Sequence, residues 1–260
     1  MTIRAKHFAA GALLCASWTA HAANLQLTVN VESLVPTDSI SFAPLHVGFG
    51  NGSFDSFDIG SVAGDAIKSV AEGGSGSAWF PAFGAADPGA VLGSVGGLLL
   101  PGASASNSFT VDTDSNSYFT FASMVVPSND FFIGNDNPLA YNLFDDQGVL
   151  QLTEIVITAG DIWDAGSEVF DPAAAAFVGE NGLRADQNSV VAFNFAELFG
   201  LNGLMTGAGY TFDSQLTAST EIYRIGFAPS PVPLPAAFPL FAAALAGLGL
   251  TKRARRKAQR

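Results

Sequence analysis

The chain has one cysteine, Cys15, and only three histidines among its 260 residues. Cys15 lies in an apolar N-terminal segment, so the rest of the chain has no cysteine for a disulfide or for nucleophilic catalysis. Zinc sites are usually built from cysteine and histidine, and beyond residue 22 only His46 remains. His46 lies among apolar residues without a G-x-S-x-G motif elsewhere, which favours a structural histidine over a catalytic base.

Basic residues are also scarce, with 11 Lys and Arg against 23 Asp and Glu. Apart from the two ends of the chain, the basic residues are Lys68, Arg184 and Arg224, whereas every acidic residue lies in this central region. The central region therefore carries a large negative charge. Nucleic acids and anionic membranes are poor partners for such a surface, and cations are good ones.

The first 22 residues have the pattern of a secretory signal peptide. Arg4 and Lys6 precede an apolar run at residues 8–18, and small residues follow at the expected cleavage site after Ala22. The run is short for a membrane span. We therefore expect export, with removal of residues 1–22 by signal peptidase.

The last segment, residues 229–260, combines a proline-rich linker, an apolar stretch at 236–250 and a basic cluster. The apolar stretch predicts a short C-terminal hydrophobic helix that is a marginal membrane anchor, with the basic end on the cytoplasmic side. This order resembles the sorting tail of bacterial exosortase substrates, the PEP-CTERM class. The Val-Pro-Leu-Pro-Ala motif at 232–236 is similar to the VPLPA variant. The resemblance implies transient anchoring in the inner membrane, processing by an exosortase, and a final place at the cell surface; a tail kept as a permanent anchor is the alternative.

Between these ends, residues 23–228 read as one β-rich domain. Short runs rich in β-branched and aromatic residues are punctuated by Gly, Asn, Asp and Pro, which predicts an all-β fold, an antiparallel β-sandwich. Short helices are expected at residues 64–72 and near Glu197, and the Gly/Ser/Ala-rich residues 75–106 are expected to form a long surface loop. The predicted strands fall in residues 25–31, 39–50, 117–126, 149–158, 189–195 and 215–228.

Four carboxylates crowd into residues 160–171 without a basic residue among them. Asp164 and Glu168 are four positions apart, and Gly166 between them permits a tight turn that can aim both carboxylates at one point. Calcium prefers six to eight oxygen ligands on loops of this kind. A solvated acidic turn is the alternative for this fragment alone.

A second fragment, residues 123–134, places Asp130 at the end of a predicted strand in the sequence SMVVPSNDFFIG. Together with WDAGSE at residues 163–168, it resembles the spondin domain of extracellular-matrix proteins, over roughly residues 40–182. The resemblance implies a β-sandwich similar to calcium-dependent lipid-binding domains, with one calcium ion at one end. Matched residue by residue, it implies Asp130, Asp164 and Glu168 as the calcium ligands.

The sequence therefore leads us to expect an exported, calcium-binding, spondin-like adhesion or extracellular-matrix module of the bacterial surface or biofilm, and not an enzyme. Extracellular polysaccharide or surface proteins are the expected partners. The alternative is an exported carbohydrate-binding or carbohydrate-hydrolysing protein. A hydrolase would need two carboxylates with raised pKa values in an aromatic-lined cleft.

Overall fold

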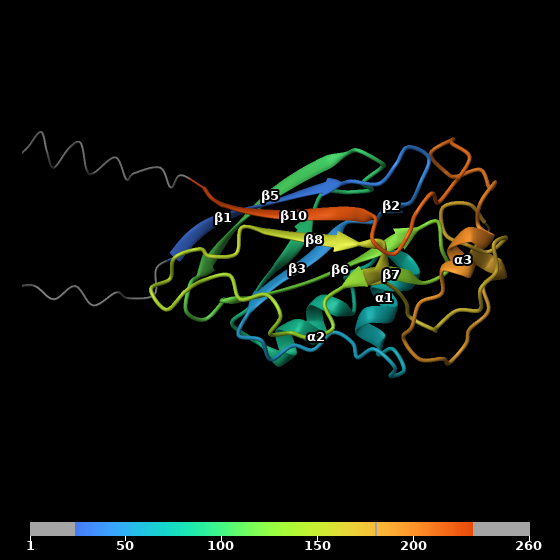
Figure 1. Cartoon of the computed structure of the whole chain (residues 1–260). Helices are drawn as coiled ribbons and strands as arrows, with labels where there is room; N and C mark the ends of the chain where they lie inside the picture. The colour runs from blue at the N-terminus through green and yellow to red at the C-terminus, as the bar shows by residue number, and fades with distance from the viewer. Residues whose placement is uncertain (1–23, 180, 231–260) are drawn as a thin grey trace, which may run out of the picture.

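The computed structural model describes residues 24–179 and 181–230 (Figure 1). The predicted signal peptide and the predicted apolar helix at 236–250 lie outside the described residues. The helices within these ranges do not meet the length and hydropathy that a membrane span requires.

Two antiparallel sheets pack face to face (Figure 1). The first has the strand order β5 (Ser104–Asp112), β1 (Asn24–Ser33), β10 (Glu221–Pro229), β8 (Glu154–Thr158). The second has the order β4 (Val91–Val95), β3 (Leu45–Gly50), β6 (Tyr118–Val126), β7 (Phe131–Gly134), β9 (Ile162–Asp164), with β2 (Ser41–Phe42) paired to β6. The predicted β-sandwich is confirmed.

The core between the sheets follows from the alternation of side chains along each strand. In β1, Leu27, Val29 and Val31 are buried, while the residues between them face outward. Aromatic rings fill the space between the sheets: Phe119 of β6 meets Phe227 of β10 edge to face, with ring centroids 4.8 Å apart. Burial of these apolar faces is the main driving force for the sandwich.

Two helices cover the outer face of the second sheet, α1 (Asp65–Gly73) and α2 (Trp79–Ala86) (Figure 1). The predicted helix at 64–72 is confirmed by α1, which buries Ile67 and Val70. Trp79 of α2 is fully buried, and its indole N–H donates to the Ser56 hydroxyl at 2.8 Å.

The expectation of a long surface loop at residues 75–106 is wrong. This segment contains α2, β4 and the start of β5. The helix forms because Trp79 and Phe83 are buried against the second sheet, and the absence of a side chain at Gly48 makes room for the Phe83 ring. Tertiary packing thus overrides the weak local preference of a Gly/Ser/Ala-rich sequence.

The strand predicted at residues 189–195 is also wrong. This segment makes only isolated bridges, Val190 with Val62 and Ala192 with Asp164, and then enters α3 (Phe195–Gly200). The predicted helix near Glu197 is confirmed by α3. Two short 3-10 helices complete the described elements, η1 (Ala159–Asp161) and η2 (Asn181–Leu183).

Candidate functional site

The tight connection between β6 and β7 brings Asp130 next to Asp164. The Ser128 hydroxyl accepts from the Phe131 N–H at 3.0 Å, and Asp130 is the last residue before β7. In the pairing of β7 with β9, Phe131 is opposite Asp164, and the Ala165 N–H donates to the Asp130 carbonyl at 3.1 Å. The strand register therefore brings the two aspartates together at one end of the sandwich.

Asp130 organises the loop that follows β9. Its Oδ2 accepts three hydrogen bonds, from the Ser167 N–H at 2.7 Å, the Ser167 hydroxyl at 3.0 Å and the Glu168 N–H at 3.0 Å. All three residues are buried. A buried carboxylate bound by several N–H and O–H donors fixes the loop around it.

Gly166 makes the turn between Asp164 and Ser167. Its φ of 64° lies in the left-handed region, and a Cβ at this position would approach the Val190 carbonyl oxygen to 2.8 Å. The Gly166 N–H donates to Asp164 Oδ1 at 2.6 Å. The glycine that the sequence indicated as a turn residue is required both by conformation and by space.

The site is electrostatically unbalanced around Asp164. Burial, with a smaller contribution from the neighbouring carboxyl of Glu197, raises the pKa of Asp164 to about 7 against the hydrogen bond from the Gly166 N–H. Burial and the charge of Asp164 raise the pKa of Asp130 to about 6 against the three hydrogen bonds from the loop. Like charges in a desolvated site favour the protonated forms, or a bound cation.

Glu168 has a cationic partner within the chain. Its Oε1 forms an ion pair with Arg184 Nη1 at 3.0 Å, and the same nitrogen donates to the Glu72 carbonyl at the end of α1 at 2.7 Å. Burial nevertheless raises the pKa of Glu168 to about 7, with Arg184 opposing the rise. Glu168 Oε2 is buried and accepts no hydrogen bond from the described residues.

Two contributors to this end of the molecule, Arg184 and Glu197, were not found by sequence reasoning. They are positioned by residues 185–192, which run beside the Asp164–Val169 loop. Asp164 and Ala192 exchange backbone hydrogen bonds at 2.6 and 3.1 Å, and the Ser189 N–H donates to the Gly166 carbonyl at 2.8 Å. Asn194 then caps α3, whose first turn carries Glu197. No local motif marks either residue, because their positions depend on this long-range pairing.

The residues fit a hard cation in part. The Asp130–Asp164 pair supplies two carboxylates with unbalanced charge, and Glu168 Oε2 adds a buried oxygen without a partner in the described residues. However, in the part of the chain that the structure describes, no three Asp, Glu, His or Cys side chains are grouped as a set that could hold a metal ion. Asp130 and Asp164 are brought together, whereas Glu168 is directed to Arg184. The assignment of Glu168 as a ligand stays a prediction.

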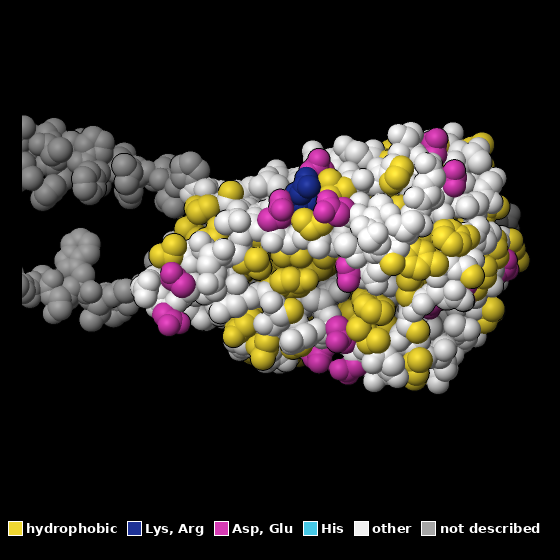
Figure 2. Space-filling model, in the orientation of Figure 1, with side chains coloured by type: hydrophobic (Ala, Val, Ile, Leu, Met, Phe, Trp, Pro, Cys, Tyr) yellow, Lys and Arg dark blue, Asp and Glu magenta, His cyan; other side chains and the backbone are white. Residues whose placement is uncertain are grey.

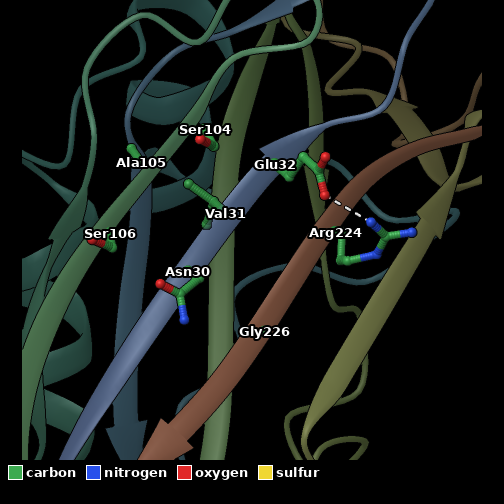
Figure 3. Close-up of a pocket in the computed structure, with 8 residues that line it drawn as sticks. All are labelled: Asn30, Val31, Glu32, Ser104, Ala105, Ser106, Arg224 and Gly226. Atoms are coloured by element: carbon green, nitrogen blue, oxygen red, sulfur yellow. Dashed lines mark hydrogen bonds and ion pairs between the residues drawn. The ribbon is translucent and has the colours of Figure 1, made fainter. Parts of the chain in front are cut away.

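Acidic side chains are also exposed away from this end of the sandwich, and Lys and Arg are scarce on the face shown in Figure 2. On the outer face of the first sheet, a hollow of about 470 Å³ lies over β5, β1 and β10. Its only lining cation in the described residues, Arg224, faces Glu32 in Figure 3, with Nη1 to Oε2 at 2.7 Å. Arg224 Nε also lies 3.2 Å from Glu154. Because carboxylates flank this arginine, the hollow is a poor site for an anion.

Comparison of the chain with models of known protein families and with curated proteins gave no match. The candidate site therefore rests on the geometry of the end of the sandwich that carries Asp130, Asp164 and Glu168, called the acid end below.

Proposed function

We propose that this protein is an exported, calcium-binding, spondin-like module that serves adhesion or the extracellular matrix at the bacterial surface. The observation that carries the proposal is the juxtaposition of Asp130 and Asp164 at one end of a β-sandwich, inside a loop network built around the Asp130 carboxylate. Calcium is the proposed ligand because carboxylates on bent loops suit a hard cation that takes six to eight oxygens. Asp130 and Asp164 would hold the ion, and Glu168 is the third proposed ligand.

Proposed export and sorting rest on the sequence of the two ends. The signal-peptide pattern of residues 1–22 supports secretion, and the tripartite tail of residues 229–260 supports sorting by an exosortase. In this proposal the domain is held transiently in the inner membrane and then released to the cell surface. No catalytic role is assigned to the domain.

The decisive experiment is thermal or chemical unfolding of the purified protein with calcium and with a chelator. Binding to the folded state alone stabilises it by RT ln(1 + [Ca]/Kd), about 2.7 kcal/mol at a hundredfold excess over Kd. Asp164→Asn keeps the shape of the side chain and removes one charged ligand, so most of the calcium-dependent gain should disappear. Asp114→Asn, which neutralises an exposed turn residue elsewhere, is the matched control.

Magnesium at the same concentration separates a calcium site from general screening of the negative surface. Magnesium demands near-octahedral geometry and retains its water, so it should stabilise the protein much less. Two results would contradict a calcium site at Asp164. One is equal stabilisation of the wild type by both ions, and the other is stabilisation of Asp164→Asn by calcium as large as that of the wild type.

The alternative function is that of an exported carbohydrate-binding or carbohydrate-hydrolysing protein. For hydrolysis, the carboxylates with raised pKa values would have to line an aromatic cleft. Asp164 and Glu197 line a small hollow of about 160 Å³ beside Phe193, which is less than the usual volume of a ligand site. None of Asp130, Asp164 and Glu168 lines the larger cleft that contains Tyr141 and Trp163. This separation favours binding over hydrolysis, and a reducing-sugar assay on neutral polysaccharides tests it.

A further inference from the structure

A separate cleft of about 320 Å³ opens at the edge of the sandwich, where β7 and β9 of one sheet lie beside β8 of the other. Its polar and aromatic lining comes from the connection after β7, from η1 and from β9: Asp136, Asn137, Tyr141, Asp161 and Trp163. Val156 and Ile157 of β8 also contribute to its wall. The volume lies within the usual range for small-molecule sites.

Two carboxylates in this cleft are each held by one oxygen. Asp136 Oδ1 accepts from the Ile59 N–H at 2.9 Å. Asp161 Oδ2 accepts from the Thr158 N–H at 2.9 Å and from its hydroxyl at 2.8 Å. Within the described residues, the second oxygen of each carboxylate has no hydrogen-bond donor. Both groups are therefore oriented in advance and keep an acceptor for a ligand.

Donors lie beside these acceptors. Asn137 Oδ1 accepts from the Leu139 N–H at 2.9 Å, which orients the amide while its NH₂ group makes no bond to the described chain. The hydroxyl of Tyr141 and the indole N–H of Trp163 likewise bond to no group among the described residues. Burial, and then the charge of Asp161, raise the pKa of Tyr141, and both residues line the cleft.

This combination matches the two-sided chemistry of a sugar ring. Hydroxyl groups of a saccharide can donate to carboxylates and accept from amide or phenol groups, and its C–H faces pack on aromatic and aliphatic walls. Among the described residues, no Lys, Arg or His lines the cleft, and its two carboxylates repel acidic sugars. A metal ion needs a shell of oxygens, for which the aromatic and aliphatic walls are unsuited.

We infer that this edge cleft, lined by Asp136, Asn137, Tyr141, Asp161 and Trp163, binds a neutral saccharide. The inference rests on the proposed role in adhesion, for which it names the ligand class and the place of contact. It assigns binding only, with no bond broken in the sugar.

The test begins with the purified protein on an array of immobilised neutral, uronic-acid and sialylated oligosaccharides. We expect retention on neutral glycans in preference to acidic ones. The neutral glycan retained best is then titrated while tryptophan fluorescence is followed, because Trp163 lines the cleft whereas Trp79 is fully buried. Tyr141→Phe and Asp136→Asn each remove one polar interaction and keep the side-chain shape.

Each cleft variant should weaken binding by roughly threefold to tenfold, the effect of one hydrogen bond, and Asp114→Asn should bind as the wild type does. Preference for acidic glycans, absence of retention on neutral ones, or unchanged binding by both cleft variants would overturn the inference. The inference would also be overturned if calcium quenched the tryptophan fluorescence without sugar and Asp136→Asn abolished that quenching, because the cleft would then bind a metal ion. Calcium-dependent unfolding, measured on the same proteins, separates the two proposals. If the wild type is stabilised by calcium but binds no sugar, the saccharide site is wrong and the calcium site stands.

Discussion

Asp130 binds Ser167 twice, through the Ser167 N–H at 2.7 Å and its hydroxyl at 3.0 Å, although 37 positions separate the two residues. The same oxygen also accepts from the Glu168 N–H. This carboxylate is thus a structural element of the loop as well as a proposed ligand, and the two roles can be separated by substitution.

Asp130→Ala should destabilise the protein by about 2–4 kcal/mol even in chelator, because buried N–H donors would lose their acceptor. Ser167→Ala removes only the hydroxyl and should cost about 1 kcal/mol. Denaturant unfolding of both variants measures the difference. A similar small cost for both would show that water replaces the carboxylate in the loop.

The pH dependence of the metal-free protein follows from the raised pKa values at the acid end. The pKa values of Asp130 and Asp164 rise from 3.8 to about 6 and about 7, and that of Glu168 rises from 4.5 to about 7. The folded state therefore holds these protons more tightly than the unfolded state does. Their contribution to stability is complete below pH 3.8 and is lost as the pH rises through about 6 to 7. In chelator, the free energy of unfolding should therefore fall over this window.

Two comparisons isolate these groups from the general repulsion of the acidic surface. Asp164→Asn should flatten the decline, since one titrating group is gone, whereas Asp114→Asn should leave its slope unchanged. Saturating calcium should also flatten the decline by stabilising the ionised forms. A decline that is equally steep in Asp164→Asn would place its origin elsewhere in the protein.

The two arginines of the described chain form ion pairs in different environments. Arg184 and Glu168 have side chains that are 17% and 6% exposed, whereas Arg224 and Glu32 are 36% and 48% exposed. Breaking a buried pair leaves an uncompensated charge, so Arg184→Met should cost about 3–5 kcal/mol. Arg224→Met should cost at most about 1 kcal/mol, because the exposed charges are solvated without it. Equal losses in urea unfolding would contradict the assigned difference in burial.

Substitution of two glycines, Gly48 in β3 and Gly84 in α2, tests the packing of α2 on the second sheet. A Cβ at Gly48 would approach the Phe83 ring to 2.2 Å, whereas a Cβ at Gly84, within α2, would meet nothing within 4 Å. Gly48→Ala should destabilise the protein by about 1–3 kcal/mol through overpacking. Gly84→Ala should stabilise it by about 0.5–1 kcal/mol, since alanine favours the helix. Melting temperatures of the two variants should thus move in opposite directions.

Sequence reasoning was most successful where local patterns coincide with burial. The strand predicted at residues 25–31 is confirmed by β1, and the helix predicted at residues 64–72 is confirmed by α1. It failed at residues 75–106, where the composition favours a loop but Trp79 and Phe83 bind the segment to the second sheet. Propensity is local, and packing of this kind is not.

The site shows the same division. Asp130 and Asp164 could be placed together because both lie in motifs that resemble those of the spondin domain. Arg184 and Glu197 could not, since they reach the site through backbone pairing of residues 185–192 with the loop after β9. The edge cleft was also unforeseen, because its lining comes from segments that meet only when the two sheets are stacked.

The described chain begins and ends at one place: the Ser230 N–H donates to the Gln26 carbonyl at 2.7 Å, and β10 runs antiparallel to β1. The acid loops and α3 lie at the opposite end (Figure 1). A pull between Ser230 and a ligand held at the acid end is therefore directed along β10. The backbone hydrogen bonds from β10 to β1 and β8 are perpendicular to that force. They are therefore loaded together in shear and do not open one after another. Because β10 is paired on both sides, it is well placed to resist such a pull.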